Sequence, residues 1–122
     1  MATLRNEGKY VLAARAGGTA LAAFTQLAIS NSTAAESATS TSFTGEYATA
    51  GLAPAVATFT YSTAYVAQWT YTWTSTETTT IHKVAVKSTA SYYLMEHLFV
   101  VDKGIISGET FTGTVQMLVS ST

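Results

Sequence analysis

The sequence contains no cysteine, a single proline and few charged residues. Without cysteine the chain forms neither disulfide bridges nor thiolate metal sites. Charged residues are 11% of the 122 residues, and the formal net charge is −1. This composition argues against nucleic acid or an anionic membrane surface as a partner recruited by bulk charge. A near-neutral surface also tolerates self-association.

Long apolar runs are missing as well. No stretch reaches the ~20 apolar residues that a membrane-spanning helix needs, so no membrane partner is expected. The segment "YVLAARAGGTALAA" (10–23) resembles the apolar part of a signal peptide, but Arg15 and the pair Gly17 and Gly18 interrupt it. Glu7 also lies in the region that should be positive. We therefore expect no cleaved signal.

Threonine and serine replace charge as the main polar residues, and the β-branched threonine suits strands. Short connections such as "VDKG" and "ISGE" carry turn-forming residues. Several strands with short links predict one mainly β domain over residues 1–122, an antiparallel β-sandwich or a jelly-roll-like barrel with one short N-terminal helix. The expected strands are 22–30, 55–63, 64–75, 79–88, 91–100 and 109–120.

Residues 1–18 form the predicted N-terminal arm and helix. Asn6 is expected to cap the helix, and Glu7 complements the positive end of its dipole. Gly17 and Gly18 end it, because glycine accepts the left-handed conformation at a helix C-terminus. Such a short helix must dock on another element to be stable.

A long loop is predicted over residues 30–52, where small polar residues show little periodicity. Phe43, Tyr47 and Leu52 are its large apolar residues, and we expect them to attach it to the body of the domain. A long loop without regular structure is usually functional or ordered by a partner.

The stretch "QWTYTWTST" (68–76) places aromatic residues at every second position. Because side chains alternate along a strand, Tyr65 and the rings up to Trp73 share one face, and threonines with Gln68 share the other. One apolar and one polar face predict a half-buried strand. A subunit interface or a ligand platform stays open for the aromatic face. The predicted core is Phe59, Tyr61, Trp69, Tyr71, Trp73, Val84, Val86, Phe99, Phe111, Val115 and Val119.

An exposed aromatic row could bind either single-stranded nucleic acid or a sugar. Stacking of single-stranded nucleic acid favours rings interleaved with lysine or arginine, but here threonine and glutamine interleave them. A sugar platform needs polar side chains on the same face, and Gln68 points to the other face. The residues between the rings therefore favour neither platform.

Catalytic and metal-binding patterns are weak. His82 and His97 lie on different predicted strands, and Glu96 faces away from His97, so the pair lacks a third metal ligand. No G-x-S-x-G elbow or phosphate-binding glycine loop is present, and no spacing singles out a carboxylate pair. We expect no enzyme, no cofactor and no metal site. The carboxylates, expected on the surface, are Glu46, Glu77, Glu96, Asp102 and Glu109.

Read end to end, the chain resembles small virion structural proteins of tailed bacteriophages, of the head decoration or minor tail type. "NEGKYVLAARAGG" is similar to their opening helix and glycine, and "FTQLAISNSTAAESATSTSFTGE" to their strand followed by a small-residue loop. "TIHKVAVKS", "YYLMEHLFV" and "ISGETFTGTVQMLVS" are similar to their later strands in the same order. The chain departs from the pattern at Ser30, where these proteins usually have glycine, and at Lys83, where they usually have glutamate.

The resemblance implies a virion protein assembled in the host cytoplasm. The leading hypothesis is a capsid decoration (cement) protein that binds the outside of the head and bridges capsid subunits. The partners would be the major capsid protein or another virion protein, and further copies of this chain, with a trimer favoured. Alternatives are a tail, neck or fibre-attachment component and, less favoured, a carbohydrate-binding module using the aromatic row. The candidate partner contacts, in a flexible segment 1–9 and the long loop, are Leu4, Arg5, Asn6, Phe43, Glu46 and Tyr47.

Overall fold

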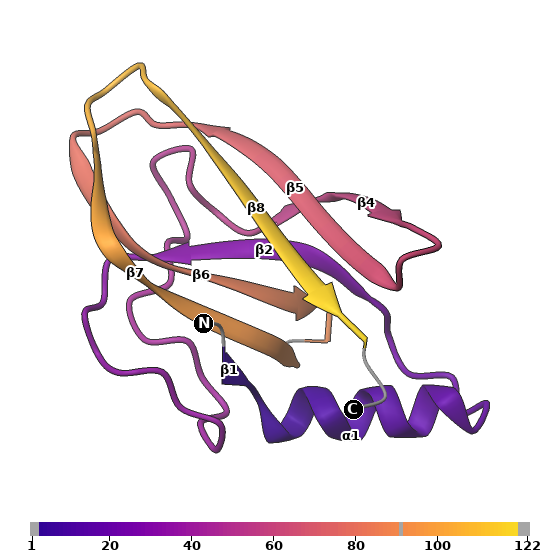
Figure 1. Ribbon diagram of the computed structural model, residues 1–122. Helices are drawn as coiled ribbons and strands as arrows, with labels where there is room; N and C mark the ends of the chain where they lie inside the picture. Colours follow the sequence, from indigo (N-terminus) through magenta and orange to yellow (C-terminus); the bar gives the residue numbers. More distant parts are fainter. Residues whose placement is uncertain (1–2, 91, 120–122) are drawn as a thin grey trace.

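The computed structural model describes residues 3–90 and 92–119 (Figure 1). It is mainly β, with 49% strand and 9% helix, and its two antiparallel sheets confirm the predicted β-sandwich. The described residues form no closed barrel. The elements are β1 Thr3–Leu4, α1 Asn6–Ala16, β2 Phe24–Ser30, β3 Ala55–Val56, β4 Thr58–Tyr61, β5 Val66–Thr74, β6 Thr79–Ser88, β7 Tyr93–Ile105 and β8 Thr110–Leu118.

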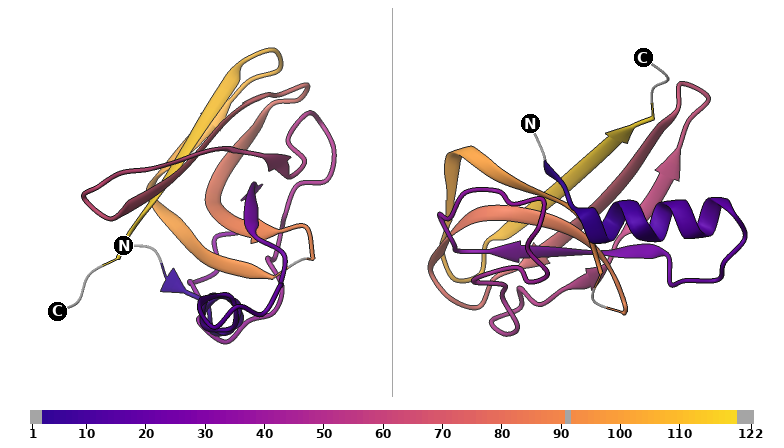
Figure 2. Two further views of the ribbon diagram at one scale, coloured as in Figure 1. Left: turned by 90° about the vertical axis from the view of Figure 1, so that its right-hand side faces the viewer. Right: turned by 90° about the horizontal axis from the view of Figure 1, so that it is seen from below.

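Two layers make up the sandwich. Sheet A has five strands in the order β1-β7-β6-β2-β3, and sheet B has three in the order β4-β5-β8. Figure 1 shows sheet B above sheet A, with α1 below, and Figure 2 shows the β4–β5 hairpin reaching beyond sheet A. One end of the inner face of sheet B therefore lies outside the sandwich.

The N-terminal helix docks on β7 through a glycine. A Cβ atom at Gly8 would lie 2.6 Å from the Cα of Leu94, so only glycine allows this approach. Glu7 lies in the first turn and Gly17 ends the helix, as predicted. Asn6 is not the cap. Arg5 occupies that position without a side-chain capping bond, because a guanidinium has no acceptor for a backbone N–H, and it donates to Glu96.

Two expected strand boundaries are wrong. The strand predicted over 55–63 is divided between the sheets, since β3 pairs with β2 whereas β4 pairs with β5. The "VDKG" stretch is not a turn. β7 continues through it because Thr79 to Ile81 of β6 supply pairing partners up to Ile105, after a register shift. The turn lies at "ISGE", where the Glu109 N–H donates to the Ile106 carbonyl at 3.0 Å.

The core lies between the sheets. Trp69, Trp73, Val84, Val86, Phe111 and Val115 are buried, which confirms six of the predicted core residues. Tyr71 and Phe99 are partly buried and pack against this core. Phe59, Tyr61 and Val119 were predicted wrongly: they are 49%, 83% and 61% exposed. They lie toward the end of sheet B that sheet A does not cover. Core residues absent from the prediction include Val11, Leu27, Ile29, Ile81 and Leu94.

Candidate interaction surfaces

A buried ion cluster joins the N-terminal segment to sheet A. Glu96 is 1% exposed; Arg5 Nη2 donates to one of its oxygens, and Lys83 Nζ lies 3.3 Å from the other. The same oxygen accepts the Ser37 N–H at 3.0 Å, and Arg5 Nη1 donates to the Ser40 carbonyl at 3.0 Å. A carboxylate shared between two cations and a loop N–H therefore fixes the N-terminal segment and the long loop together.

A second carboxylate, Glu36, anchors the long loop to the edge of sheet A. It accepts the Thr3 hydroxyl at 2.5 Å and the Leu98 N–H at 2.7 Å, and His97 Nδ1 lies 3.5 Å away. Burial alone would raise the pKa of Glu36, but these two hydrogen bonds and the nearby imidazole outweigh it. The pKa of Glu36 is therefore lowered, and the folded protein favours its ionised form.

A third set of contacts holds the end of the loop. Glu46 accepts the Tyr93 hydroxyl at 2.5 Å and lies 3.5 Å from Lys87 Nζ. The rings of Phe43 and Tyr93 are 5.7 Å apart, and the Arg5 guanidinium lies 4.9 Å from the Tyr93 ring centre. Burial raises the pKa of Tyr93, and the hydrogen bond to Glu46 raises it further, so this phenol stays neutral.

These contacts alter the interpretation of the six candidate contact residues. Arg5, Phe43 and Tyr47 are 2%, 5% and 9% exposed, so the domain itself uses most of their surface. Leu4 and Glu46 are partly buried, and only Asn6 is exposed. Residues 3–9 are not a flexible arm, because they form β1 and the start of α1 on β7. Residues 1–2 lie outside the described residues.

Sequence reasoning missed this cluster, although a signal was present. Glu96 and His97 separate the apolar runs "YYLM" and "LFV", and a buried acid in such a strand requires a partner. It was assigned to the surface, which is wrong. Its partners depend on register: Ala85 pairs with Glu96, which places Lys83 and Lys87 on either side of it. Glu36 gave no signal, since nothing in the loop sequence indicates which N–H it will accept.

The two histidines are held apart by separate carboxylates. His82 Nδ1 lies 2.7 Å from Asp102, and His97 lies beside Glu36. Among the described residues no group of three or more potential ligands is arranged to hold a metal ion. No described helix is long and apolar enough to span a membrane.

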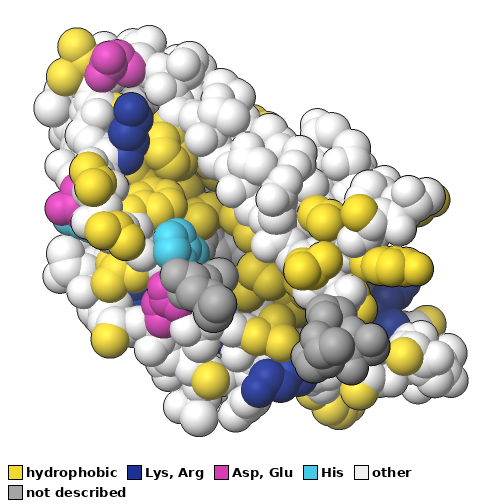
Figure 3. Space-filling model, in the orientation of Figure 1, with side chains coloured by type: hydrophobic (Ala, Val, Ile, Leu, Met, Phe, Trp, Pro, Cys, Tyr) yellow, Lys and Arg dark blue, Asp and Glu magenta, His cyan; other side chains and the backbone are white. Residues whose placement is uncertain are grey.

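Sheet B differs from the rest of the domain because its strands contain none of the thirteen charged residues. In Figure 3 the surface over β8 and β4 is white and yellow, and the coloured charges lie elsewhere. Threonines fill the outer face in matched pairs: Thr72 faces Thr112 with hydroxyls 2.7 Å apart, and Gln116 donates to Gln68 at 2.7 Å. This face is an uncharged array of hydroxyls and amides.

The inner face of sheet B carries the aromatic row. Trp69 and Trp73 are 3% and 2% exposed, and their indole N–H groups donate to the carbonyls of Phe24 and Ala53 at 2.8 and 2.9 Å. Tyr65 does not belong to this face, because it is 73% exposed and has a φ of 64°. The buried indoles form the core, which removes the stacking platform that a carbohydrate-binding module would use.

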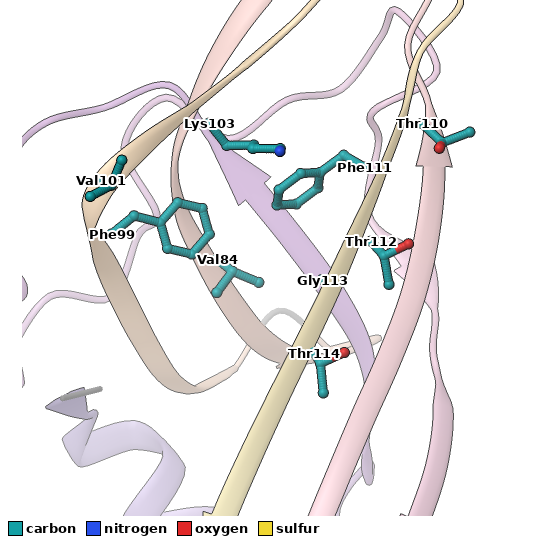
Figure 4. A pocket seen from close by; sticks show the side chains of 9 residues that line it. All are labelled: Val84, Phe99, Val101, Lys103, Thr110, Phe111, Thr112, Gly113 and Thr114. Atoms are coloured by element: carbon teal, nitrogen blue, oxygen red, sulfur yellow. The ribbon is translucent and has the colours of Figure 1, made fainter.

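Two of the clefts in the described part of the chain border sheet B. One, of about 620 Å³, lies between β7 and β8; Figure 4 shows Phe99 and Phe111 pointing into it, with the Lys103 side chain reaching toward Phe111. The other, of about 310 Å³, lies between α1 and sheet B and is lined mainly by apolar residues such as Leu12, Phe59 and Met117. Figure 3 shows apolar surface inside this hollow between the layers.

Comparison with known proteins found no match: no family model, no curated protein and no solved structure matches this chain.

Proposed function

We propose that this chain is a structural protein of a bacteriophage particle, a capsid decoration protein that binds the assembled head through sheet B. The observation that carries the proposal is the uncharged outer face of sheet B, with its paired threonines. The similarity of the segment order to that of small phage virion proteins supports the assignment to a bacteriophage particle. The partners in this proposal are the major capsid protein and further copies of this chain.

The physical reason lies in how a cement protein stabilises a shell. It binds the assembled form and not free subunits, so mass action shifts the equilibrium toward the shell. A sheet that is already formed before docking loses little conformational entropy on binding. An uncharged face also avoids leaving an unpaired charge buried, which is costly in an interface. The part of the long loop that faces solvent extends this contact surface in our proposal.

Binding to particles tests the proposal directly. We expect Thr112→Lys, which adds a charge to the centre of the face, to lower the affinity for heads lacking the protein at least tenfold. Thr19→Lys is the matched control, because Thr19 is exposed between α1 and β2. Co-sedimentation with purified heads measures both. Equal occupancy by the wild type and Thr112→Lys would show that the face does not contact the shell.

Copy number separates the head from the tail. Quantitative staining of purified particles should give about one copy of this chain per major capsid subunit. A ratio of a few per hundred would move the protein to the tail, neck or fibre attachment, which is the alternative role. Absence from particles would overturn the virion proposal altogether.

A further inference from the structure

The outer edge of sheet B is an unpaired strand. The Ser62 N–H donates to the Val66 carbonyl at 3.0 Å, so these two residues form a hydrogen-bonded pair. Pairs alternate along an antiparallel ladder, which makes Thr60–Gln68 the next hydrogen-bonded pair. The backbone N–H and C=O groups of Phe59 and Tyr61 therefore point away from β5, and no described residue pairs with them.

Apart from its short length of four residues, this edge has none of the features that keep edge strands from pairing. Natural edges are usually protected by charged side chains, proline, a bulge or a covering loop. All four residues of β4, Thr-Phe-Thr-Tyr, are exposed, and none is charged. The pairing with β5 runs through the four residues without a register shift. The strand is a regular, neutral edge with free donors and acceptors.

The aromatic side chains at this edge are also largely exposed to solvent. Tyr61 is 83% exposed and Phe59 is 49% exposed, although both rings share the inner face with Trp69. The Phe59 ring lies 5.2 Å from the Trp69 ring and 6.3 Å from the Tyr61 ring, so the aromatic core continues outward to the free edge. Because the Phe59 and Tyr61 rings are exposed, they lack the stabilisation that burial of apolar surface gives to Trp69 and Trp73.

We infer that β4 pairs with β4 of a second copy of this chain, antiparallel about a two-fold axis at Thr60. In this register Phe59 of each copy forms a hydrogen-bonded pair with the second copy's Tyr61, which satisfies all the outward groups of both residues. On the inner face the Phe59 ring lies opposite the second copy's Tyr61 ring, and on the outer face the two copies of Thr60 lie opposite each other. A neutral strand opposes its own copy without like-charge repulsion.

A second copy fits this edge better than it fits the other free edge of sheet B. The inner residues of β8, such as Phe111 and Val115, are already buried, so pairing there would cover little apolar surface. At β4 the two copies together would cover four aromatic rings, on the order of 500 Å². A specific interface buries at least about 1,000 Å² in total, so residues beside the four rings would have to supply the remainder.

The dimer does not depend on the capsid proposal, because it forms in solution from this chain alone. Light scattering on the purified protein at 1–100 µM should give a dimer, since a two-fold contact closes after two copies. A monomer over this range, or the trimer favoured from shell symmetry, would overturn the inference. Head binding is measured separately, so failure of one proposal leaves the other standing.

Introduced cysteines test the register, since the chain has none of its own. Residues facing each other across a non-hydrogen-bonded pair have Cα atoms about 4.5 Å apart, within the range that a disulfide bridges. Thr60→Cys should therefore form a covalent dimer under mild oxidation. Thr72→Cys, on the same face but on the central strand, is the matched control. Equal cross-linking of the two variants would contradict the proposed axis.

A charge on the edge tests the contact itself. Tyr61→Lys should raise the dimer dissociation constant at least tenfold, because two ammonium groups would meet an aromatic contact. Val100→Lys is the control, since Val100 is 95% exposed on β7. Circular dichroism verifies that both variants are folded. A Tyr61→Lys protein that dimerises as tightly as Val100→Lys would exclude β4 as the interface.

Discussion

Sheet A and sheet B are stabilised by different chemistry. Sheet A carries a buried carboxylate, Glu96, between Arg5 and Lys83, and this cluster attaches the N-terminal segment and the long loop. Sheet B has no charge and is held by aromatic packing and indole hydrogen bonds on one face. The difference shows how a chain with few charges can concentrate them where irregular segments are attached, and leave the strands of another sheet uncharged.

The ion cluster of sheet A is where we expect the largest loss of stability. Glu96→Ala leaves the cations of Arg5 and Lys83 buried without a carboxylate, which should cost about 3–5 kcal/mol in the free energy of unfolding. Urea denaturation measures it. Glu77→Ala, at an exposed acid, should change stability by less than about 0.5 kcal/mol. If Glu96→Ala does not fold, Glu96→Gln keeps the shape, and equal stability of Glu96→Gln and Glu77→Ala would contradict an ionic role.

The aromatic face of sheet B should respond almost as strongly. Trp73→Ala removes a 2% exposed ring and its hydrogen bond to Ala53, with an expected cost of about 3–5 kcal/mol. Tyr61→Ala, on the same face but outside the sandwich, should cost far less in the monomer. Thermal unfolding in dilute solution compares the two. Similar losses would mean that the end of sheet B is as well covered as its centre.

Acid should weaken the loop attachment at Glu36 before it affects sheet B. The lowered pKa in the fold means that ionised Glu36 stabilises the protein at neutral pH and that this contribution is lost as pH falls below about 4.5, the ordinary value. Glu36→Gln should therefore show a shallower decline in unfolding free energy between pH 5 and 3. Glu77→Gln should keep the wild-type dependence of unfolding free energy on pH. Identical pH dependence in the two variants would show that Glu36 does not supply this acid-sensitive stability.

The threonine face should be the least sensitive to substitution. Thr112→Val keeps the shape and removes one exposed hydroxyl that faces Thr72, so we expect a change within about 0.5 kcal/mol. Urea denaturation is again the measurement. A loss above 1 kcal/mol would show that the hydroxyl pairs stabilise the sheet, which would weaken the case that they are kept for a partner.

Strand character was predictable because it depends on local pattern. Alternation in "QWTYTWTST" correctly placed Trp69 and Trp73 in the core and threonines outside, and glycines marked the end of α1. The attachment of the long loop through Phe43, Tyr47 and Leu52 was also predicted, and all three are buried. These features follow from side-chain direction and backbone preference, which neighbours in the sequence determine.

The sequence by itself thus determined a mainly β domain with an N-terminal helix, a neutral threonine face and an aromatic core. Only the tertiary structure decided that β3 and β4 lie in different sheets, that Glu96 is buried between two cations, and that Phe59 and Tyr61 lie outside the sandwich. The physical reason is that the alternation of apolar and polar residues determines which side chains share a face of a strand. What covers that face depends on strand register and on how far the two sheets overlap. Those depend on contacts between residues far apart in the chain.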